Sequence, residues 1–504
     1  MSVLPPEIPP RRPEPSTVGD AAPAAAGRRV WCGTLGCDKN LVDSEALLGR
    51  FRARGFAPVN DPEAADVWVL NTCGFIAPAR VDSADTVREL IAAKGDRVLV
   101  VTGCWAQEHG DAIRRDHPGV DLVGGVGRFD ELAEALEQRL PALPPMDPQV
   151  APYAGFGDRH LLTPRHLAFV KIGEGCDCHC TFCRIPMIRG RLRSRPVQEV
   201  EAEVRRLVED GVTEIQLVSQ NTSDYGRDTG ESLLDLVRRL DGVPGLRRIR
   251  LLYLYAGLIS SDDALRLLNL ERVVPYLDLP IQHASPRLLR AMRRPGDPEA
   301  VARFLLTLRR ERPDVVLRTT ALLGFPGEDD EDVAELLDFM ARVRFDHLGT
   351  YRYSPERGTP AARLPGAVAD EEVADREARV LDLQAEIGLE RQVERLGSRW
   401  EVVVDEVLSA ADPEGGAREL LDGLADGRWY DERERAVVAG VLNEGAPVAL
   451  ARSYHFGYDL DGVVALPGRG LRAGQWLTAG FRAVTPHDVW ALPISADTAS
   501  RGES

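Results

Sequence analysis

Short apolar runs alternate with amphipathic stretches between residues 28 and 140. The amphipathic stretches 41–54 and 129–140 repeat their apolar positions at the spacing of a helix. Alternation of strands and helices predicts a parallel sheet with helices on both faces, so we expect a doubly wound α/β domain over 28–140. Four runs have the length and composition of buried strands: 28–33, 66–70, 97–101 and 120–125.

The same alternation resumes at residue 167 and continues to about residue 352. It contains six β/α units, which are fewer than the eight of a closed barrel. We therefore expect a partial (β/α)6 barrel, open at one side, with a charged helix at 369–396 that completes a domain over 167–396. Six apolar runs are the strand candidates: 167–172, 214–219, 248–254, 276–281, 315–324 and 346–353.

Beyond residue 396 the pattern changes to short β-type segments separated by turns, which predicts a small antiparallel β-barrel over 397–494. Its strand candidates are 399–407, 435–442, 446–454, 461–466 and 475–484. The remaining segments lack a periodic apolar pattern. We expect a disordered lead at 1–27, a linker with six prolines at 141–166, and a tail at 495–504.

Composition narrows the functional classes. The chain has 62 Lys and Arg against 79 Asp and Glu, a net charge of −17, which argues against a broad nucleic-acid surface because phosphates require cations. The same charge is compatible with a basic macromolecular partner. No apolar run approaches the roughly 18 residues of a membrane span, and 1–27 lacks the apolar core of a signal peptide. We therefore expect a cytoplasmic protein with no membrane partner.

Three cysteines far apart in the sequence each follow a predicted strand: Cys37, Cys73 and Cys104. In an open parallel sheet, ligands bind beyond the carboxyl ends of the strands, so we expect these thiols to converge at one edge. Thiolates suit iron–sulfur clusters, zinc or copper(I), and three ligands leave one metal position open. The alternative is three unrelated core cysteines. Cys32 lies inside the first strand and is expected in the core.

Polar residues close to the cysteines have less specific interpretations. Asn40 and Asp43 resemble a helix cap with an acid in the first turn, and we expect capping there. The chain has only three lysines, Lys39, Lys94 and Lys171, and the first and last lie near cysteines. We hypothesise that Lys39 and Lys171 occupy confined places that suit a compact ammonium but not a guanidinium, whereas Lys94 lies in an exposed turn.

A second cysteine set has the spacing CxxxCxxC. Cys176, Cys180 and Cys183 follow the first strand of the central domain, at the end of a barrel where chemistry is usually carried out. This spacing suits three irons of a four-iron cluster, and the fourth iron would be free for a small chelating molecule. A zinc ribbon needs a second cysteine pair, and no cysteine follows Cys183. We leave Cys178, an extra thiol in the loop, out of the ligand set.

The motif and its barrel resemble the radical S-adenosylmethionine (SAM) enzymes. With three N-terminal cysteines and a C-terminal small barrel similar to a TRAM domain, the chain resembles their methylthiotransferase family over about residues 28–494. Within that family it is most similar to the RimO branch. The likeness departs from the family pattern at Cys178 and at Asp38, where proline is usual. Six stretches carry it: LGCDKNLVDSE (35–45), NTCGFI (71–76), IPMIRGRLRSRP (185–196), DLPIQHAS (278–285), GFPGE (324–328) and YSPERGTPA (353–361).

The resemblance implies two 4Fe-4S clusters and SAM as cofactors. It places the SAM-binding cluster on Cys176, Cys180 and Cys183, and the cluster that holds the transferred sulfur on the three N-terminal cysteines. One SAM is then the source of a 5′-deoxyadenosyl radical, and a second SAM is the methyl donor.

Further cofactor contacts follow from the same resemblance. Phe182 is expected either against the adenine of SAM or in the barrel packing. Gly324 and Gly327 allow close backbone approach to SAM or form a turn that ends a strand. Gln282 and His283 lie at the predicted barrel mouth and could reach SAM or substrate.

The branch implies an enzyme that methylthiolates the β-carbon of an aspartate in ribosomal protein uS12, with an electron donor and a sulfur donor as further partners. Residues 395–494 hold ten arginines and fifteen acidic residues, which favours a basic protein over RNA as the partner. The alternatives are a tRNA methylthiotransferase of the MiaB type and, in another class, a non-catalytic iron–sulfur electron carrier. The carrier leaves DLPIQHAS, GFPGE and the third domain unexplained.

Overall fold

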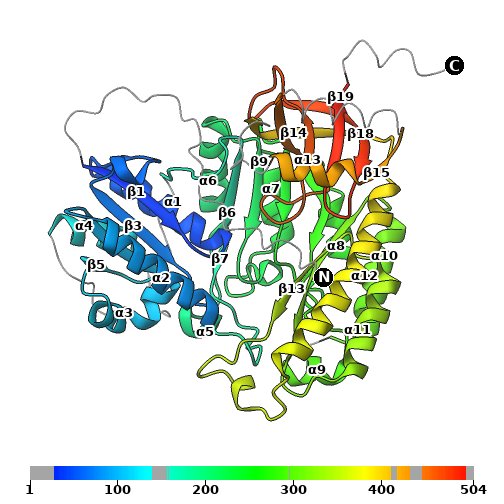
Figure 1. The fold of residues 1–504 in the computed structure, drawn as a ribbon, viewed down its shortest axis with the longest axis horizontal. Coiled ribbons are helices and arrows are strands. Elements are labelled where there is room, and N and C mark those ends of the chain that lie inside the picture. The colour runs from blue at the N-terminus through cyan, green and yellow to red at the C-terminus, as the bar shows by residue number, and fades with distance from the viewer. Residues whose placement is uncertain are drawn as a thin grey trace.

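The computed structural model describes residues 28–138, 156, 158–294, 296–409, 417–431 and 445–494. Within them the chain forms three parts that follow one another in sequence (Figure 1). The N-terminal part ends at residue 138, the central part ends with the long helix α12 (Asp370–Val393), and a C-terminal barrel follows. The expected lead 1–27, the tail 495–504, the strand candidate 435–442 and much of the expected linker 141–166 lie outside the described residues.

The N-terminal part is a parallel sheet with the strand order β2-β1-β3-β4-β5, which confirms the predicted parallel architecture. The four predicted strands are present. The sequence did not indicate β2, because two residues paired at the sheet edge carry no apolar pattern of their own. The strands are β1 (Arg29–Thr34), β2 (Ala57–Pro58), β3 (Val67–Thr72), β4 (Val98–Gly103) and β5 (Leu122–Val123).

Helices cover both faces of this sheet. On one face, α1 (Asp38–Ala53) and α4 (Phe129–Glu137) bury residues such as Phe51 and Leu132 against Val69. On the other face, α2 (Ala77–Ala93) and α3 (Cys104–Asp116) pack around Trp68 and Val101. The domain is therefore doubly wound, and Cys32 lies in its core as expected.

The central part is an open sheet of six parallel strands in the order β13-β12-β11-β10-β9-β6. All six predicted strands are present, and within the described residues the edge strands β6 and β13 do not pair with each other, which agrees with a partial barrel. The strands are β6 (Leu167–Lys171), β9 (Glu214–Val218), β10 (Arg248–Leu251), β11 (Val273–Asp278), β12 (Val316–Leu323) and β13 (His347–Arg352).

Helices surround this sheet, and small elements follow β6. Between β6 and the first long helix lie the strand pair β7 (Gly173–Glu174) and β8 (Arg193–Ser194) and the single helical turn α5 (Ile185–Ile188). The longer helices are α6 (Val197–Glu209), α7 (Leu233–Asp241), α8 (Ser261–Leu268), α9 (Pro286–Ala291), α10 (Pro298–Glu311) and α11 (Asp330–Val343).

The C-terminal part closes into a ring in the order β14-β16-β17-β19-β18, with β18 paired back to β14. This confirms the predicted small barrel. One pair, β17–β19, is parallel, whereas the other pairs are antiparallel. The elements are β14 (Arg399–Ser409), α13 (Ala417–Ala425), β15 (Arg428–Trp429), β16 (Pro447–Arg452), β17 (Val464–Pro467), β18 (Trp476–Val484) and β19 (Val489–Pro493).

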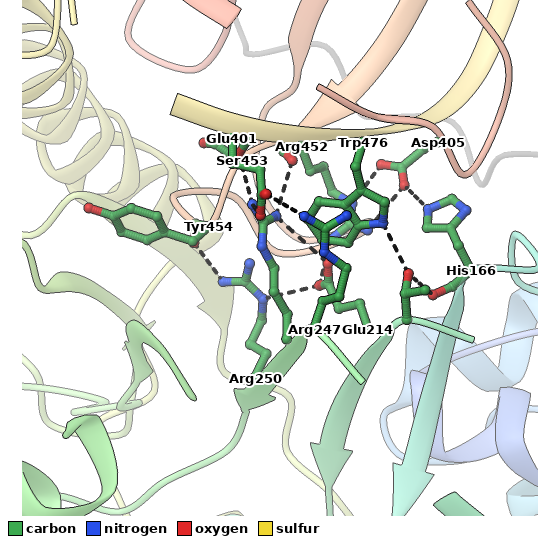
Figure 2. A network of polar contacts seen from close by, with 12 residues as sticks. His166, Glu214, Arg247, Arg250, Glu401, Asp405, Arg452, Ser453, Tyr454 and Trp476 are labelled. Atoms are coloured by element: carbon green, nitrogen blue, oxygen red, sulfur yellow. Dashed lines mark hydrogen bonds and ion pairs between the residues drawn. The ribbon is translucent and has the colours of Figure 1, made fainter. Parts of the chain in front are cut away.

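The C-terminal barrel is attached to the central sheet by buried ion pairs (Figure 2). Arg452 donates to Glu214, the first residue of β9, at 2.8 Å, and to Asp405 at 2.6 Å. Arg250 of β10 donates to the carbonyl of Tyr454 at 3.0 Å. Because Glu214 begins its strand, the barrel lies at the amino ends of the central strands, away from the loop that follows the carboxyl end of β6.

A second buried contact joins the N-terminal and central parts. Arg159, which falls in the expected linker, lies between Glu45 of α1 at 3.6 Å and Glu203 of α6 at 3.2 Å. All three side chains are almost fully buried. Residues 158–166 thus pack between the two parts, with Thr163 and His166 also buried.

Candidate functional site

The three N-terminal cysteines lie where neighbouring strands end. Cys37 is the N-cap of α1, Cys73 directly follows β3, and Cys104 begins α3 directly after β4. Strands β1, β3 and β4 are adjacent in the sheet, so the three loops meet at one edge. The loops touch, since a Cβ placed on Gly36 would lie 3.2 Å from the Cys73 Sγ. The structure therefore brings these cysteines together as the strand-end argument predicts.

Burial favours the protonated form of two of these thiols, Cys73 and Cys104. It raises the pKa of Cys104 to about 12, with Arg189 opposing the shift and Cys37 and Cys73 adding to it. Burial likewise raises the pKa of Cys73. A metal binds thiolates, so its binding must displace these protons.

Among the described residues, no group of three His, Cys, Asp or Glu side chains is arranged to hold a single metal ion.

The second cysteine set lies on the loop between β7 and α5, after the first strand of the central sheet. The amide of Cys176 donates to the Gly190 carbonyl at 3.2 Å, and that of Cys183 donates to the Cys180 carbonyl at 3.1 Å. Arg294 brings a cation to this loop, with its Nη1 4.0 Å from the Cys180 Sγ. All three thiols are partly exposed, and burial still raises the pKa of Cys183 to about 12.

Cys178 has its own partners. The Asn221 amide donates to its Sγ at 3.2 Å, and the Sγ lies 3.8 Å from the Asp224 carboxylate. The backbone amide of Cys178 donates to the Cys176 Sγ at 3.5 Å. The Cys178 side chain thus contacts the segment after β9, while its amide contacts a cysteine of the second set.

The helical turn α5 contacts both cysteine sets. This turn begins two residues after Cys183, and its Ile188 packs against Cys104 and Val126 of the N-terminal part. Arg184, the N-cap of α5, forms an ion pair with Glu108 of α3 at 2.5 Å. A single helical turn thus separates the two sites.

A ring of four buried charges lies beside α5. Lys171 contacts Asp43 at 2.6 Å and Glu174 at 2.5 Å. Arg189 contacts the same two carboxylates, each at 3.0 Å. Asp43 belongs to α1 and the other three residues to the central part, so the ring, hereafter the charge ring, connects the two parts next to both cysteine sets. The sequence alone did not indicate the charge ring, since its members come from separate segments.

The capping expected of Asn40 and Asp43 is wrong. Cys37 is the N-cap of α1, and no side chain caps this helix end. The Asn40 amide instead donates to the carbonyls of Leu35 at 3.0 Å and Thr72 at 3.2 Å. The carboxylate of Asp43 instead forms ion pairs with Lys171 and Arg189 of the central part.

Tyr253 is a site residue that the sequence analysis missed. It lies just after β10 with a φ of 58°, a left-handed conformation that is unusual for an aromatic residue and is often found at functional sites. Its hydroxyl donates to Asp38 at 3.2 Å, and the Lys39 ammonium lies 3.0 Å from its ring centroid. Lys39 also contacts Asp38 at 3.0 Å and is buried. These contacts hold the segment after Cys37 against the central part.

The other predicted cofactor contacts stay predictions, and each of these residues also has contacts within the chain. Phe182 packs against the cluster that includes Leu288 and Met292, and it stays partly exposed. Gly324 and Gly327 both have left-handed backbones, with φ of 76° and 84°. A Cβ on Gly324 would lie 2.6 Å from Val373, so the backbone at this glycine comes close to helix α12.

Gln282 and His283 follow β11. Gln282 is partly exposed, has a φ of 70°, and pairs through its backbone with β12. His283 is buried and accepts from the Ser285 amide at 3.0 Å, and burial lowers its pKa to about 4. His283 is therefore a neutral core residue at physiological pH.

Two parts of the chain match known protein families. Residues 29–125 match the family described as "Uncharacterized protein family UPF0004", and residues 170–340 match the "Radical SAM superfamily". Among solved structures, the radical SAM methyltransferase TsrM of Kitasatospora setae is similar at a TM-score of 0.47 and 15% identity, covering 77% of this chain and 81% of that chain.

Three relatives carry the name "Ribosomal protein uS12 methylthiotransferase RimO". That of Desulforamulus reducens is 41% identical and covers 74% of this chain and 86% of its own length. That of Alkalilimnicola ehrlichii is 38% identical and covers 93% of this chain and 98% of its own length. That of Thermus thermophilus is 39% identical and covers 86% of this chain and 98% of its own length. Similarity of this degree over nearly the full length of both chains means that the chain belongs to the RimO family, within the radical SAM superfamily.

Proposed function

We propose that this protein is a radical SAM methylthiotransferase that adds a methylthio group to the β-carbon of an aspartate in ribosomal protein uS12. The observation that carries the proposal is the placement of two cysteine sets on either side of one helical turn, in a chain of the RimO family. An electron carrier has no need for two open sites beside one helical turn. A transferase must bring a sulfur and a substrate radical together.

Each cysteine set would hold one 4Fe-4S cluster: Cys176, Cys180 and Cys183 the SAM-binding one, and Cys37, Cys73 and Cys104 the other. When bound, these groups supply a 5′-deoxyadenosyl radical that removes a hydrogen from the substrate carbon, and a sulfur, methylated by a second SAM, that takes its place. The chain's own residues position the two sites. The charge ring fixes the N-terminal part to the central part, which keeps the sites aligned.

The acidic C-terminal barrel supports a protein substrate over tRNA. Its ten arginines between 395 and 494 are outnumbered by fifteen acidic residues, and several of these arginines are already paired. A tRNA enzyme needs cations free for phosphates. No helix in the described part of the chain is long and apolar enough to cross a membrane. We further propose a cytoplasmic location, an external electron donor and an external sulfur donor.

The substrate is tested by the intact mass of uS12 from cells with and without the gene. We expect uS12 to be heavier by one methylthio group, less the hydrogen it replaces, only when the gene is present. Complementation with a Cys37→Ala variant is the matched control and should leave uS12 unmodified. An unmodified uS12 together with a gene-dependent change in tRNA would instead establish the tRNA alternative.

The ligand sets are tested separately by iron analysis. Anaerobically reconstituted protein should bind about eight irons, four per cluster. Replacing Cys176, Cys180 and Cys183 with alanine should halve the iron and abolish SAM cleavage. Replacing Cys37, Cys73 and Cys104 should also halve the iron but preserve SAM cleavage while sulfur transfer stops. Full iron content in the second variant would contradict the N-terminal site.

A further inference from the structure

Arg189 belongs to the central part but reaches into the N-terminal part. It directly follows α5 and is buried, with 3% of its surface exposed. Its Nη1 contacts the carboxylates of Asp43 and Glu174, and its Nη2 donates to the Asn40 side-chain oxygen. The guanidinium therefore ends at Asn40, the residue three positions after Cys37.

Asn40 is in contact with all three segments of the N-terminal cysteine set. Its amide nitrogen donates to the carbonyl of Leu35, two residues before Cys37, and to that of Thr72, the residue before Cys73. Its side-chain oxygen lies 3.6 Å from the Cys104 Sγ. The Arg189 guanidinium thus lies next to both Asn40 and the Cys104 thiol, to which it also hydrogen-bonds.

The charge ring holds Arg189 in this position. Asp43 and Glu174 each contact both Arg189 and Lys171, so the two cations and two anions fix one another in a region without solvent. In such a region the field of a charge is weakly screened. A nearby cation stabilises the extra negative charge that an iron–sulfur cluster gains on reduction, and hydrogen bonds and net charge set cluster potentials.

We propose that Arg189, held next to Asn40 and Cys104, raises the reduction potential of the cluster held on the opposite part of the chain, and that Asp43 limits this effect. The inference rests on the proposed function, because it requires a cluster on Cys37, Cys73 and Cys104. A residue of the central part, which carries the SAM-binding cysteines, thereby controls the potential of the cluster on the N-terminal part. The two sites are then coupled electrostatically as well as in position.

The test measures the midpoint potential of the N-terminal cluster by a redox titration followed by electron paramagnetic resonance. The parent is the full chain with Cys176, Cys180 and Cys183 replaced by alanine, so that only one cluster remains. In this parent, Arg189→Gln should shift the potential to more negative values, and Arg189→Lys should restore part of the shift. Asp43→Asn removes a negative charge and should shift the potential in the opposite direction.

Arg159→Gln is the matched control. Arg159 is equally buried and also joins the N-terminal part to the central part, through Glu45 and Glu203, and within the described residues neither of these contacts Asn40. Its replacement loosens the same interface without removing the charge next to Asn40, so the potential should stay at the parent value.

Opposite shifts for Arg189→Gln and Asp43→Asn support the inference. Equal shifts for Arg189→Gln and Arg159→Gln, or no shift in Arg189→Gln, overturn it and leave the proposed function intact. If the Arg189→Gln variant fails to bind iron, the midpoint potential of the Asp43→Asn variant is the deciding measurement. An unchanged potential in that variant overturns the inference. A parent without any cluster overturns the N-terminal ligand assignment and the inference together.

Discussion

The three lysines of this arginine-rich chain differ in their surroundings. Lys171 is almost fully buried between two carboxylates at 2.5 and 2.6 Å, and Lys39 lies on the Tyr253 ring. Lys94 pairs with Asp121, but its own side chain is only 16% exposed, so it is less open than the sequence predicts. The hypothesis that two of the three lysines occupy confined places agrees with these positions. Arg189 already contacts both carboxylates, so a second, broader and planar guanidinium at position 171 does not fit there without displacing one of them.

Lys171→Arg should therefore lose both stability and turnover. Overpacking a buried site typically costs about 1–3 kcal/mol, and the displaced carboxylate would disturb Arg189. Chemical unfolding and SAM-dependent turnover measure the two effects. Lys94→Arg is the control, and it should match the wild type in both. Wild-type stability and turnover in Lys171→Arg would show that the charge ring tolerates a larger cation.

Cys178→Ser should retain both clusters and activity. Its Sγ lies against Asn221 and Asp224, and a hydroxyl can keep these polar contacts. Iron content and SAM cleavage in the reconstituted variant measure the outcome. Loss of the SAM-binding cluster would mean that Cys178 belongs to the ligand set.

Elements with a strong local pattern were predictable, and those held by their neighbours were not. The run 315–324 became β12 (Val316–Leu323), because its apolar length alone specifies a buried strand. Strands β2 and β15 have two residues each and exist only through pairing. The cysteine convergence was predictable because strand ends share an edge. The charge ring was not, because Asp43 and Lys171 are complementary only after two domains have packed.

The turn after β12 provides a prediction for one element. Gly324→Ala would place a Cβ 2.6 Å from Val373, a stiff branched side chain, on a backbone with φ of 76°. The backbone alone costs roughly 1–2 kcal/mol for a residue other than glycine, and the contact adds to this. Gly230→Ala is the control, since Gly230 has a φ of 83° with open space around its Cβ. Denaturant unfolding should show the larger loss for Gly324→Ala, and equal losses would refute the steric part of the argument.

At the scale of the whole molecule, buried charges fasten the three parts together. Glu214 meets Arg452, Arg250 and Arg248 where the C-terminal barrel joins the central sheet (Figure 2). Burial alone would raise the pKa of Glu214, but Arg452, Arg250 and Arg248 lower it from 4.5 to about 2. The three arginines come from two domains, so the ionised carboxylate stabilises their association.

Stability should accordingly fall in acid. Glu214 has a lower pKa in the folded than in the unfolded chain, so its contribution is complete above about pH 4.5 and is lost as the pH falls towards 2, on the order of 3 kcal/mol in total. Unfolding free energies measured between pH 7 and 3 should show this loss, and Glu214→Gln should flatten the dependence in that window. Glu89→Gln, a change at an exposed glutamate, is the control. An unaltered pH profile in Glu214→Gln would contradict the assignment.

The position of the C-terminal barrel sets a minimum size for any partner that touches both it and the cysteine loops. The barrel lies at the amino ends of the central strands and the cysteine loops at their carboxyl ends. The longest of these strands, β12, has eight residues, which corresponds to about 26 Å at roughly 3.3 Å per residue. A peptide of a few residues cannot span this length. A short fragment around the target aspartate would therefore meet only one end of the enzyme, whereas a folded protein or a larger assembly can contact both at once.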